Sequence, residues 1–290
     1  MINWADKMQV FQDWFTQQWV IVRGQKINVN EFQWLVGPFG NVNGIGEEFL
    51  FQLAEKEGLV IDRNQTSKGL INPFSILNLS DSEKNKLSLK VIDFYENTSA
   101  YKLQLRVKWN LFFVPFGWLV NRLFSNRINQ LNIPFKIKEE ENLLKSEIIT
   151  LIDPQTNKIK YTFWLRTETA SGKVMYSGIY STCKLPNGIT CVKAVFPLPN
   201  GNATVIMKPT VGSNGSLILH SIGKKVNDAG FYFLLKDAKG SYWTNFISSF
   251  QDRLTIQEYE DELQAMQILT LYGFRVLTLN YRIILNKKDK

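Results

Sequence analysis

The strongest constraint on the fold of this 290-residue chain is a change of hydrophobic period after Asn97. From Tyr101 to Trp109 apolar and polar residues alternate strictly, which is typical of a strand with one buried face. From Ser146 onward, apolar segments follow one another, separated by turn sequences rich in Asn, Pro and Gly. The pattern predicts about ten antiparallel strands, too many for a flat sheet, and hence a large, bent sheet or a barrel-like meander.

The residues before Asn97 have apolar side chains at helical spacing instead. We expect helices over Asp6–Trp19 and Glu47–Gly58, and a third that opens at the capping box Ser80–Glu83. One more helix, about 116–131, is expected to pack on the sheet. The predicted fold class is α+β, with two regions: an N-terminal helical region, 1–79, and an antiparallel β domain, 80–290.

Basic and aromatic residues gather around the helix at 116–131. The formal net charge is +8, and the window Asn97–Lys138 holds seven basic residues and no acidic one. Such a stretch suits an anionic partner with an apolar part. The candidate ligand- or membrane-binding residues are Phe112, Phe113, Phe116, Trp118, Arg122 and Arg127. The alternative is that the helix simply packs its apolar stripe on the sheet while its arginines face water.

The two cysteines are predicted to lie opposite each other. Leu185-Pro-Asn-Gly188 and Leu198-Pro-Asn-Gly201 both resemble a three-residue hairpin loop that ends in a glycine. If Leu185 faces Ile189, Cys183 faces Cys191, close enough for a disulfide. Without a signal peptide in view, two reduced thiols are the favoured interpretation, with a redox pair and a disulfide as the alternatives.

Few side chains suit catalysis. One histidine and two cysteines cannot form a metal cluster, and we expect neither a metal nor a cofactor. His220 is expected on the strand face opposite Leu217 and Leu219, where a structural role is favoured over a catalytic one. Lys193 could act as an amine nucleophile if it were buried, although most such lysines are ordinary.

Several stretches together resemble a family of uncharacterised bacterial proteins. They are Phe94–Tyr101, Pro115–Leu119, Phe196–Val205 and Gly230–Phe233. The resemblance covers most of the chain from about Gly37, but it implies no activity, because none is assigned to the family.

The predicted function is the binding of an apolar or amphipathic, lipid-like ligand, since a curved aromatic-rich sheet can enclose an apolar pocket. The expected partners are a hydrophobic small molecule or an anionic membrane surface, and the expected location is the cytoplasm or the periphery of a membrane. The longest apolar run, 111–120, is too short to span a bilayer. The alternatives are an enzyme with a non-histidine site and, less favoured, a single-stranded nucleic-acid binder that uses the basic strand face Lys102–Lys108.

Overall fold

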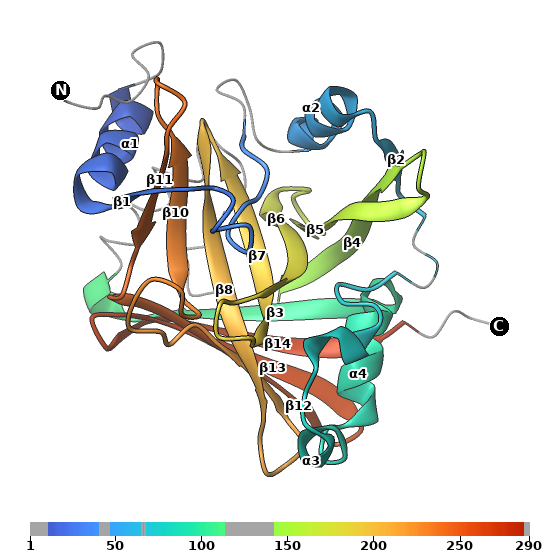
Figure 1. The fold of residues 1–290 in the computed structure, drawn as a ribbon. Helices are drawn as coiled ribbons and strands as arrows, with labels where there is room; N and C mark the ends of the chain where they lie inside the picture. The colour runs from blue at the N-terminus through green and yellow to red at the C-terminus, as the bar shows by residue number, and fades with distance from the viewer. Residues whose placement is uncertain (1–10, 41–46, 65, 67, 114–141, 287–290) are drawn as a thin grey trace.

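The computed structural model describes residues 11–40, 47–64, 66, 68–113 and 142–286. Its α-helices are α1 (Phe11–Arg23), α2 (Glu48–Glu57), α3 (Asp81–Lys84) and α4 (Leu89–Glu96), with 3-10 turns η1 (Phe74–Leu77), η2 (Thr98–Ala100) and η3 (Leu111–Phe113). Short helices therefore precede a large antiparallel sheet, and the α+β prediction is confirmed (Figure 1).

The strands come mainly from the C-terminal two thirds of the chain. They are β1 (Gln25–Ile27), β2 (Val60–Asp62), β3 (Tyr101–Trp109), β4 (Asn142–Asp153), β5 (Lys158–Glu168), β6 (Val174–Lys184), β7 (Thr190–Leu198), β8 (Gly201–Val211), β9 (Leu217–His220), β10 (Phe231–Lys236), β11 (Tyr242–Phe246), β12 (Phe250–Tyr259), β13 (Glu262–Leu271) and β14 (Phe274–Leu285).

The sheet closes on itself. Following hydrogen-bonded neighbours from β8 through β7, β6, β5, β4, β3, β14, β13, β12 and β9 leads back to β8, which gives a closed 10-strand barrel. Closure removes the free edges that a sheet of this size would otherwise expose. Of the two forms expected from the sequence, a bent open sheet and a barrel-like meander, the structure therefore has the barrel.

Two long strands change partner along their length, which lets further strands branch from the barrel. β8 pairs with β10 through Gly201–Val205 and with β9 through Lys208–Val211. β10 continues to β11 and then β1, while β2 pairs with the far half of β4 at Thr150–Ile152. Strands from region 1–79 thus pair with strands from region 80–290, and the two-domain division stays a prediction.

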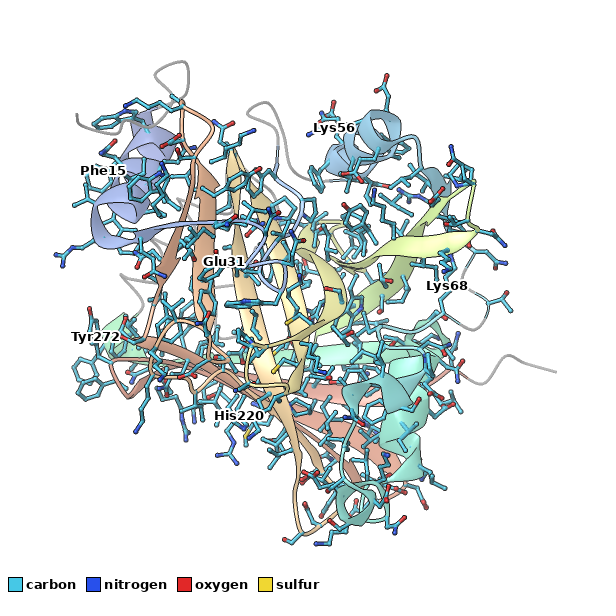
Figure 2. All side chains as sticks on the ribbon, viewed as in Figure 1. Phe15, Glu31, Lys56, Lys68, His220 and Tyr272 are labelled. Carbon is cyan, nitrogen blue, oxygen red and sulfur yellow. The ribbon has the colours of Figure 1, made fainter. Side chains whose placement is uncertain are left out.

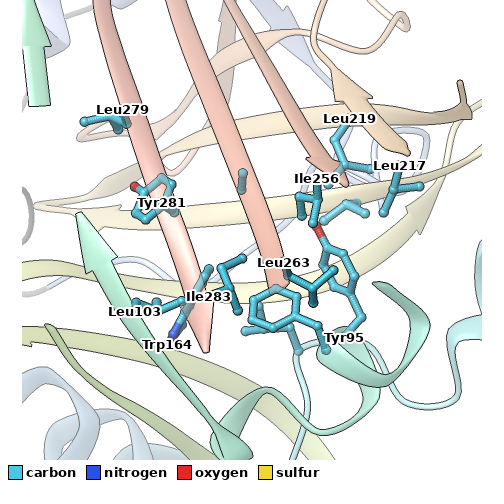
Figure 3. Packing of buried hydrophobic residues seen from close by; sticks show 14 of the residues in the cluster. Tyr95, Leu103, Trp164, Leu217, Leu219, Ile256, Leu263, Leu279, Tyr281 and Ile283 are labelled. Atoms are coloured by element: carbon cyan, nitrogen blue, oxygen red, sulfur yellow. The ribbon is translucent and has the colours of Figure 1, made fainter. Parts of the chain in front are cut away.

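Apolar side chains pack on both faces of this sheet. The largest cluster fills the barrel and includes Leu103, Trp164, Leu217 and Ile283, together with Tyr95 from α4 (Figure 3). On the outer face, α2 packs Phe49 and Leu50 on β4 to β7. The structure therefore has an inner core closed in part by α4 and outer layers formed by the N-terminal segments.

The prediction of one helix that opens at the capping box and continues to Tyr95 is wrong, because the structure has two short helices there. The capping box of Ser80 and Glu83 is present, but α3 ends at Lys84. Leu87 is buried, and the Ser88 side chain accepts a hydrogen bond from the Lys90 backbone, so a new helix, α4, begins. The chain thereby changes direction and carries Val91, Phe94 and Tyr95 into the barrel cluster.

The helix expected at about 116–131 lies outside the described residues, so that part of the fold prediction stays a prediction. Among the helices that are described, none has the length and apolar character needed to cross a bilayer.

Candidate functional site

A buried arginine lies on the inner face of the barrel wall, near the C-terminal end of β5. On β5, Trp164 and Arg166 share the inward face, because alternate residues of a strand point to the same side. Their partners on β6 are Gly178 and Tyr176, respectively. Only 6% of Arg166 is exposed, which is rare for a charged side chain and needs a physical explanation.

Aromatic rings surround the guanidinium group of Arg166. Its central carbon lies 3.9 Å from the centre of the Tyr176 ring and 4.2 Å from that of the Trp164 ring. Nη1 donates a hydrogen bond of 3.1 Å to the hydroxyl of Tyr281 on β14. Such stacking and donation favour the cation. We call Arg166 and its neighbours Trp164, Tyr176, Tyr180 and Tyr281 the Arg166 cage.

The cage itself is held by hydrogen bonds and by one small residue. The Tyr176 hydroxyl donates to the Tyr180 hydroxyl at 3.1 Å, and Trp164 Nε1 donates to Ser146 Oγ at 2.8 Å. Gly178 lies between the two tyrosines, where a Cβ atom would come within 3.0 Å of the Tyr176 hydroxyl. A side chain at position 178 would therefore require the Tyr176 ring to shift by a few tenths of an ångström.

The charge of Arg166 is not neutralised by any carboxylate that the structure describes. Burial lowers the pKa of Arg166, but the electrostatic attraction of the Tyr281, Tyr180 and Tyr176 hydroxyl oxygens and the hydrogen bond to Tyr281 raise it, and the balance lies above the usual value. Burial raises the pKa values of Tyr176 and Tyr180, so these phenols stay neutral at pH 7. In addition, Nε of Arg166 is buried and has no hydrogen-bond partner. A buried cation with a free donor is costly unless an anion joins it.

A second ionisable group faces the same interior. Asp252 on β12 pairs with Leu269 of the barrel cluster, and its Oδ2 accepts a hydrogen bond of 2.7 Å from Gln267 Nε2. Its Oδ1 is buried without a partner. Burial raises the pKa of Asp252 to about 7, and its charge contributes to the raised pKa of Tyr180. Asp252 therefore gains or loses its proton near neutral pH.

These side chains place a buried cation and several polar groups inside an apolar barrel. Arg166 offers a buried donor and a full positive charge, and the phenols of the cage offer further polar contacts. The neighbouring interior residues, such as Leu105, Leu279 and Ile148, are aliphatic. Apolar walls with a few convergent polar groups are typical of small-molecule sites. Within the described ranges no group of His, Cys, Asp and Glu could hold a metal ion.

The binding residues predicted from the sequence lie elsewhere. Phe112 is 93% exposed on η3, whereas Phe113 is partly buried, with its ring centre 6.4 Å from that of Phe274. Phe116, Trp118, Arg122 and Arg127 lie outside the described residues. The prediction that this set binds a ligand or a membrane therefore stays a prediction.

The other candidate residues have structural surroundings. Lys193 is buried on the outer face of the barrel, where its Nζ donates to the carbonyl oxygens of Trp34 at 3.2 Å and Val36 at 2.9 Å. Burial lowers the pKa of Lys193. His220 is half-buried opposite the buried Leu217 and Leu219, as predicted. The two hydrogen bonds of Lys193 therefore hold residues 34–36 against β7.

The facing cysteines are confirmed. Cys183 pairs with Cys191 in the β6–β7 ladder, and both are free and buried. The loop between them ends at Gly188, whose φ is 86°, as expected for three residues. The second Leu-Pro-Asn-Gly turn differs: Leu198 pairs with Gly201, and Asn200 takes the positive φ in a two-residue loop.

Sequence analysis missed the Arg166 cage. The available signal was a charged residue two positions after Trp164, which period-two alternation places on the same face. Tyr176 and Tyr180 flank Gly178 in the same way on the next strand. The pattern became meaningful only once the pairing of β5 with β6 and the approach of β14 were known.

Comparison with known proteins identifies a bacterial relative. The chain is 26% identical over 253 residues to the "Uncharacterized membrane protein YndJ" of Bacillus subtilis (strain 168), an alignment that covers 86% of this chain and 43% of that protein. It thus resembles an uncharacterised bacterial protein. The resemblance predicted from the sequence is confirmed, and the chain spans less than half the length of this curated relative. No protein-family model matches the chain, and no solved structure matches it.

Proposed function

We propose that the barrel binds an amphipathic anion, with its acidic head group at the Arg166 cage and its apolar part among the aliphatic interior residues. The observation that carries this proposal is Arg166 itself: a buried guanidinium with a free Nε and no carboxylate partner among the described residues. A carboxylate or phosphate group would supply the missing charge and accept the free hydrogen bond.

Two further observations support an amphiphile rather than a small polar anion. Trp164 and Tyr281 of the cage belong to the largest apolar cluster among the described residues, and Tyr180 packs against it, so a ligand at Arg166 would have apolar side chains as its neighbours. The relative from Bacillus subtilis is called a membrane protein, and membranes are the main source of amphipathic anions. This fits the prediction of a lipid-like ligand and a place at the periphery of a membrane.

The alternative of an enzyme rests on Asp252. Lys193, the amine considered for nucleophilic catalysis, lies on the outer face with its Nζ bonded to two carbonyl oxygens. Asp252 is buried, faces the interior and has a pKa of about 7, which suits a general base. A ligand site needs Arg166 alone, whereas catalysis would also need Asp252.

The proposal is tested by comparing two ligands that differ only in their head groups. Dodecanoate and dodecanol should compete for the barrel with a fluorescent fatty-acid probe, monitored by its emission. We expect wild-type protein to favour dodecanoate by about tenfold or more, the worth of a hydrogen bond to a charged group. Arg166→Met should abolish this preference, because the cation is lost while an apolar side chain of similar length remains.

Arg253→Met is the matched control. Arg253 lies on the same strand as Asp252 but is exposed, so its loss should leave the preference for dodecanoate unchanged. Equal affinity for the acid and the alcohol in the wild type, or a preference that survives Arg166→Met, would contradict the proposal.

A further inference from the structure

A second feature lies at one end of the barrel, away from the Arg166 cage. Four large side chains are exposed there: Leu111 (72%), Phe112 (93%), Tyr272 (76%) and Phe274 (66%). We call this set the aromatic edge. It joins two segments distant in sequence, the η3 turn and the β13–β14 hairpin, whose tip carries Tyr272 (Figure 2).

Specific contacts hold the two segments together. The backbone N–H of Asn110 donates to the carbonyl oxygen of Val276 at 2.9 Å, and its side chain donates to that of Arg275 at 2.9 Å. The ring of Phe113 packs near that of Phe274 beneath the exposed residues. The aromatic edge is therefore attached to the ends of β3 and β14, which a rigid barrel holds in place. Exposed apolar side chains gathered in this way mark interaction sites.

The backbone at Tyr272 is unusual for such a residue. Leu271 pairs with Phe274, so Tyr272 and Gly273 form a two-residue loop in which both have positive φ values, 50° and 81°. Asn, Asp and Gly are the residues that suit the first position of this turn. A large aromatic residue there is strained, so its presence at the hairpin tip calls for a reason beyond the turn itself.

Charge differs between the two ends of β13. At the aromatic edge, Lys108 and Arg275 are exposed, and neither β3 nor β14 contains an acidic residue. At the opposite end, the β12–β13 hairpin has the same two-residue geometry, with Glu260 at φ 47° and Asp261 at φ 64°. The aromatic edge is therefore apolar and basic, whereas the tip of the opposite hairpin carries two acidic residues, of which Asp261 is paired with Lys90.

We propose that the aromatic edge docks on an anionic lipid bilayer, with Leu111, Phe112, Tyr272 and Phe274 in the interface and Lys108 and Arg275 against acidic head groups. Tyrosine at head-group level and basic residues beside apolar ones are typical of interfacial binding. Single-stranded nucleic acid fits less well, because base stacking needs aromatic rings on the basic strand face. The outward residues of β3 are Lys102, Gln104, Arg106 and Lys108.

The test is co-sedimentation of the protein with vesicles of two compositions. We expect binding to equal parts of phosphatidylglycerol and phosphatidylcholine, and little binding to phosphatidylcholine alone. Tyr272→Asn should weaken binding by about tenfold, since a large side chain no longer enters the interface. Lys108→Gln and Arg275→Gln should each weaken it by about fivefold and reduce its salt dependence.

The matched control is Glu260→Asn, which places the same residue at the same position of the other hairpin. Asn suits a positive φ, so both variants should unfold at a higher temperature than the wild type. Only Tyr272→Asn should lose vesicle binding, and Glu260→Asn should retain it in full. The proposal would be overturned if the wild type bound neutral vesicles as well as anionic ones, or if Tyr272→Asn bound vesicles as strongly as the wild type. It would also be overturned if the wild type bound a single-stranded oligonucleotide and no vesicles.

Discussion

Asp252 and Arg166 show how the barrel interior determines the state of single residues. Both are buried, both carry a polar atom without a partner, and no ion pair among the described residues neutralises either. The consequences differ. Arg166 keeps its charge because its pKa starts far above neutrality, whereas burial raises the pKa of Asp252 to about 7. The folded protein therefore holds a fixed cation on β5 and, separately on β12, an acid that titrates near neutral pH.

The raised pKa of Asp252 predicts how the free energy of unfolding depends on pH. Folded Asp252 has a pKa of about 7, and the usual value is 3.8, so between these values the folded state binds the extra proton. Its contribution to stability is full below about pH 4 and is lost as pH rises to 7. We expect the slope to approach about 1.4 kcal/mol per pH unit between pH 5 and 7.

Urea unfolding at several pH values measures this slope, with Asp252→Asn as the reference. Burial lowers the pKa of His220, so His220 contributes to the pH dependence with the opposite sign. Because this contribution is the same in both proteins, the difference between their unfolding free energies isolates the contribution of Asp252. A difference in unfolding free energy that is constant from pH 5 to 8 would show that Asp252 titrates as an exposed carboxyl.

Sequence reasoning at the scale of residues succeeded where only one strand or one turn was involved. The burial of Leu217 and Leu219 opposite His220 follows from alternation within a single strand. Arg166 could be placed on a face in the same way. Its burial could not be predicted, because it depends on Tyr281, which is 115 positions away and reaches it only through the order of the strands.

Among the elements, β6 and β7 illustrate what a turn sequence can establish. The three-residue loop fixes the register, and the register sets Cys183 opposite Cys191. Helix ends were harder to predict than strand pairs. The capping box begins α3 as expected, but the burial of Leu87 and a second cap at Ser88 divide the predicted helix, and both depend on contacts with the barrel.

The two thiols give a prediction about reactivity. Burial raises the pKa of Cys183 to about 11, and burial with the nearby Cys183 thiol raises the pKa of Cys191 to about 12. The reactive thiolate is therefore scarce at pH 8, at least about a hundredfold below that of an ordinary cysteine. Iodoacetamide should leave the native protein unmodified and label both cysteines in urea, as judged by intact mass.

Rapid labelling of either cysteine in the native protein would contradict this account of the β6–β7 pair. So would a disulfide in protein purified without oxidant, because the structure holds both cysteines as free thiols.

At the scale of the whole molecule, barrel closure creates the candidate site. The sequence predicts many antiparallel strands and a bent sheet, but hydrophobic period does not determine which strands become neighbours. The pairing of β3 with both β14 and β4, and of β9 with both β8 and β12, joins the two ends of the sheet. These long-range contacts bring β5, β6 and β14 around Arg166, whose cage no local pattern could have predicted.

Native mass spectrometry of the freshly purified protein tests the central claim most directly. For the wild type we predict a population heavier than the denatured chain by a few hundred daltons, the mass of one amphipathic acid, which organic extraction removes. Arg166→Met should purify without it, and Arg253→Met should retain it. A ligand-free wild type that also fails to take up dodecanoate, or an adduct that Arg166→Met retains in full, would contradict a barrel that holds its ligand through Arg166.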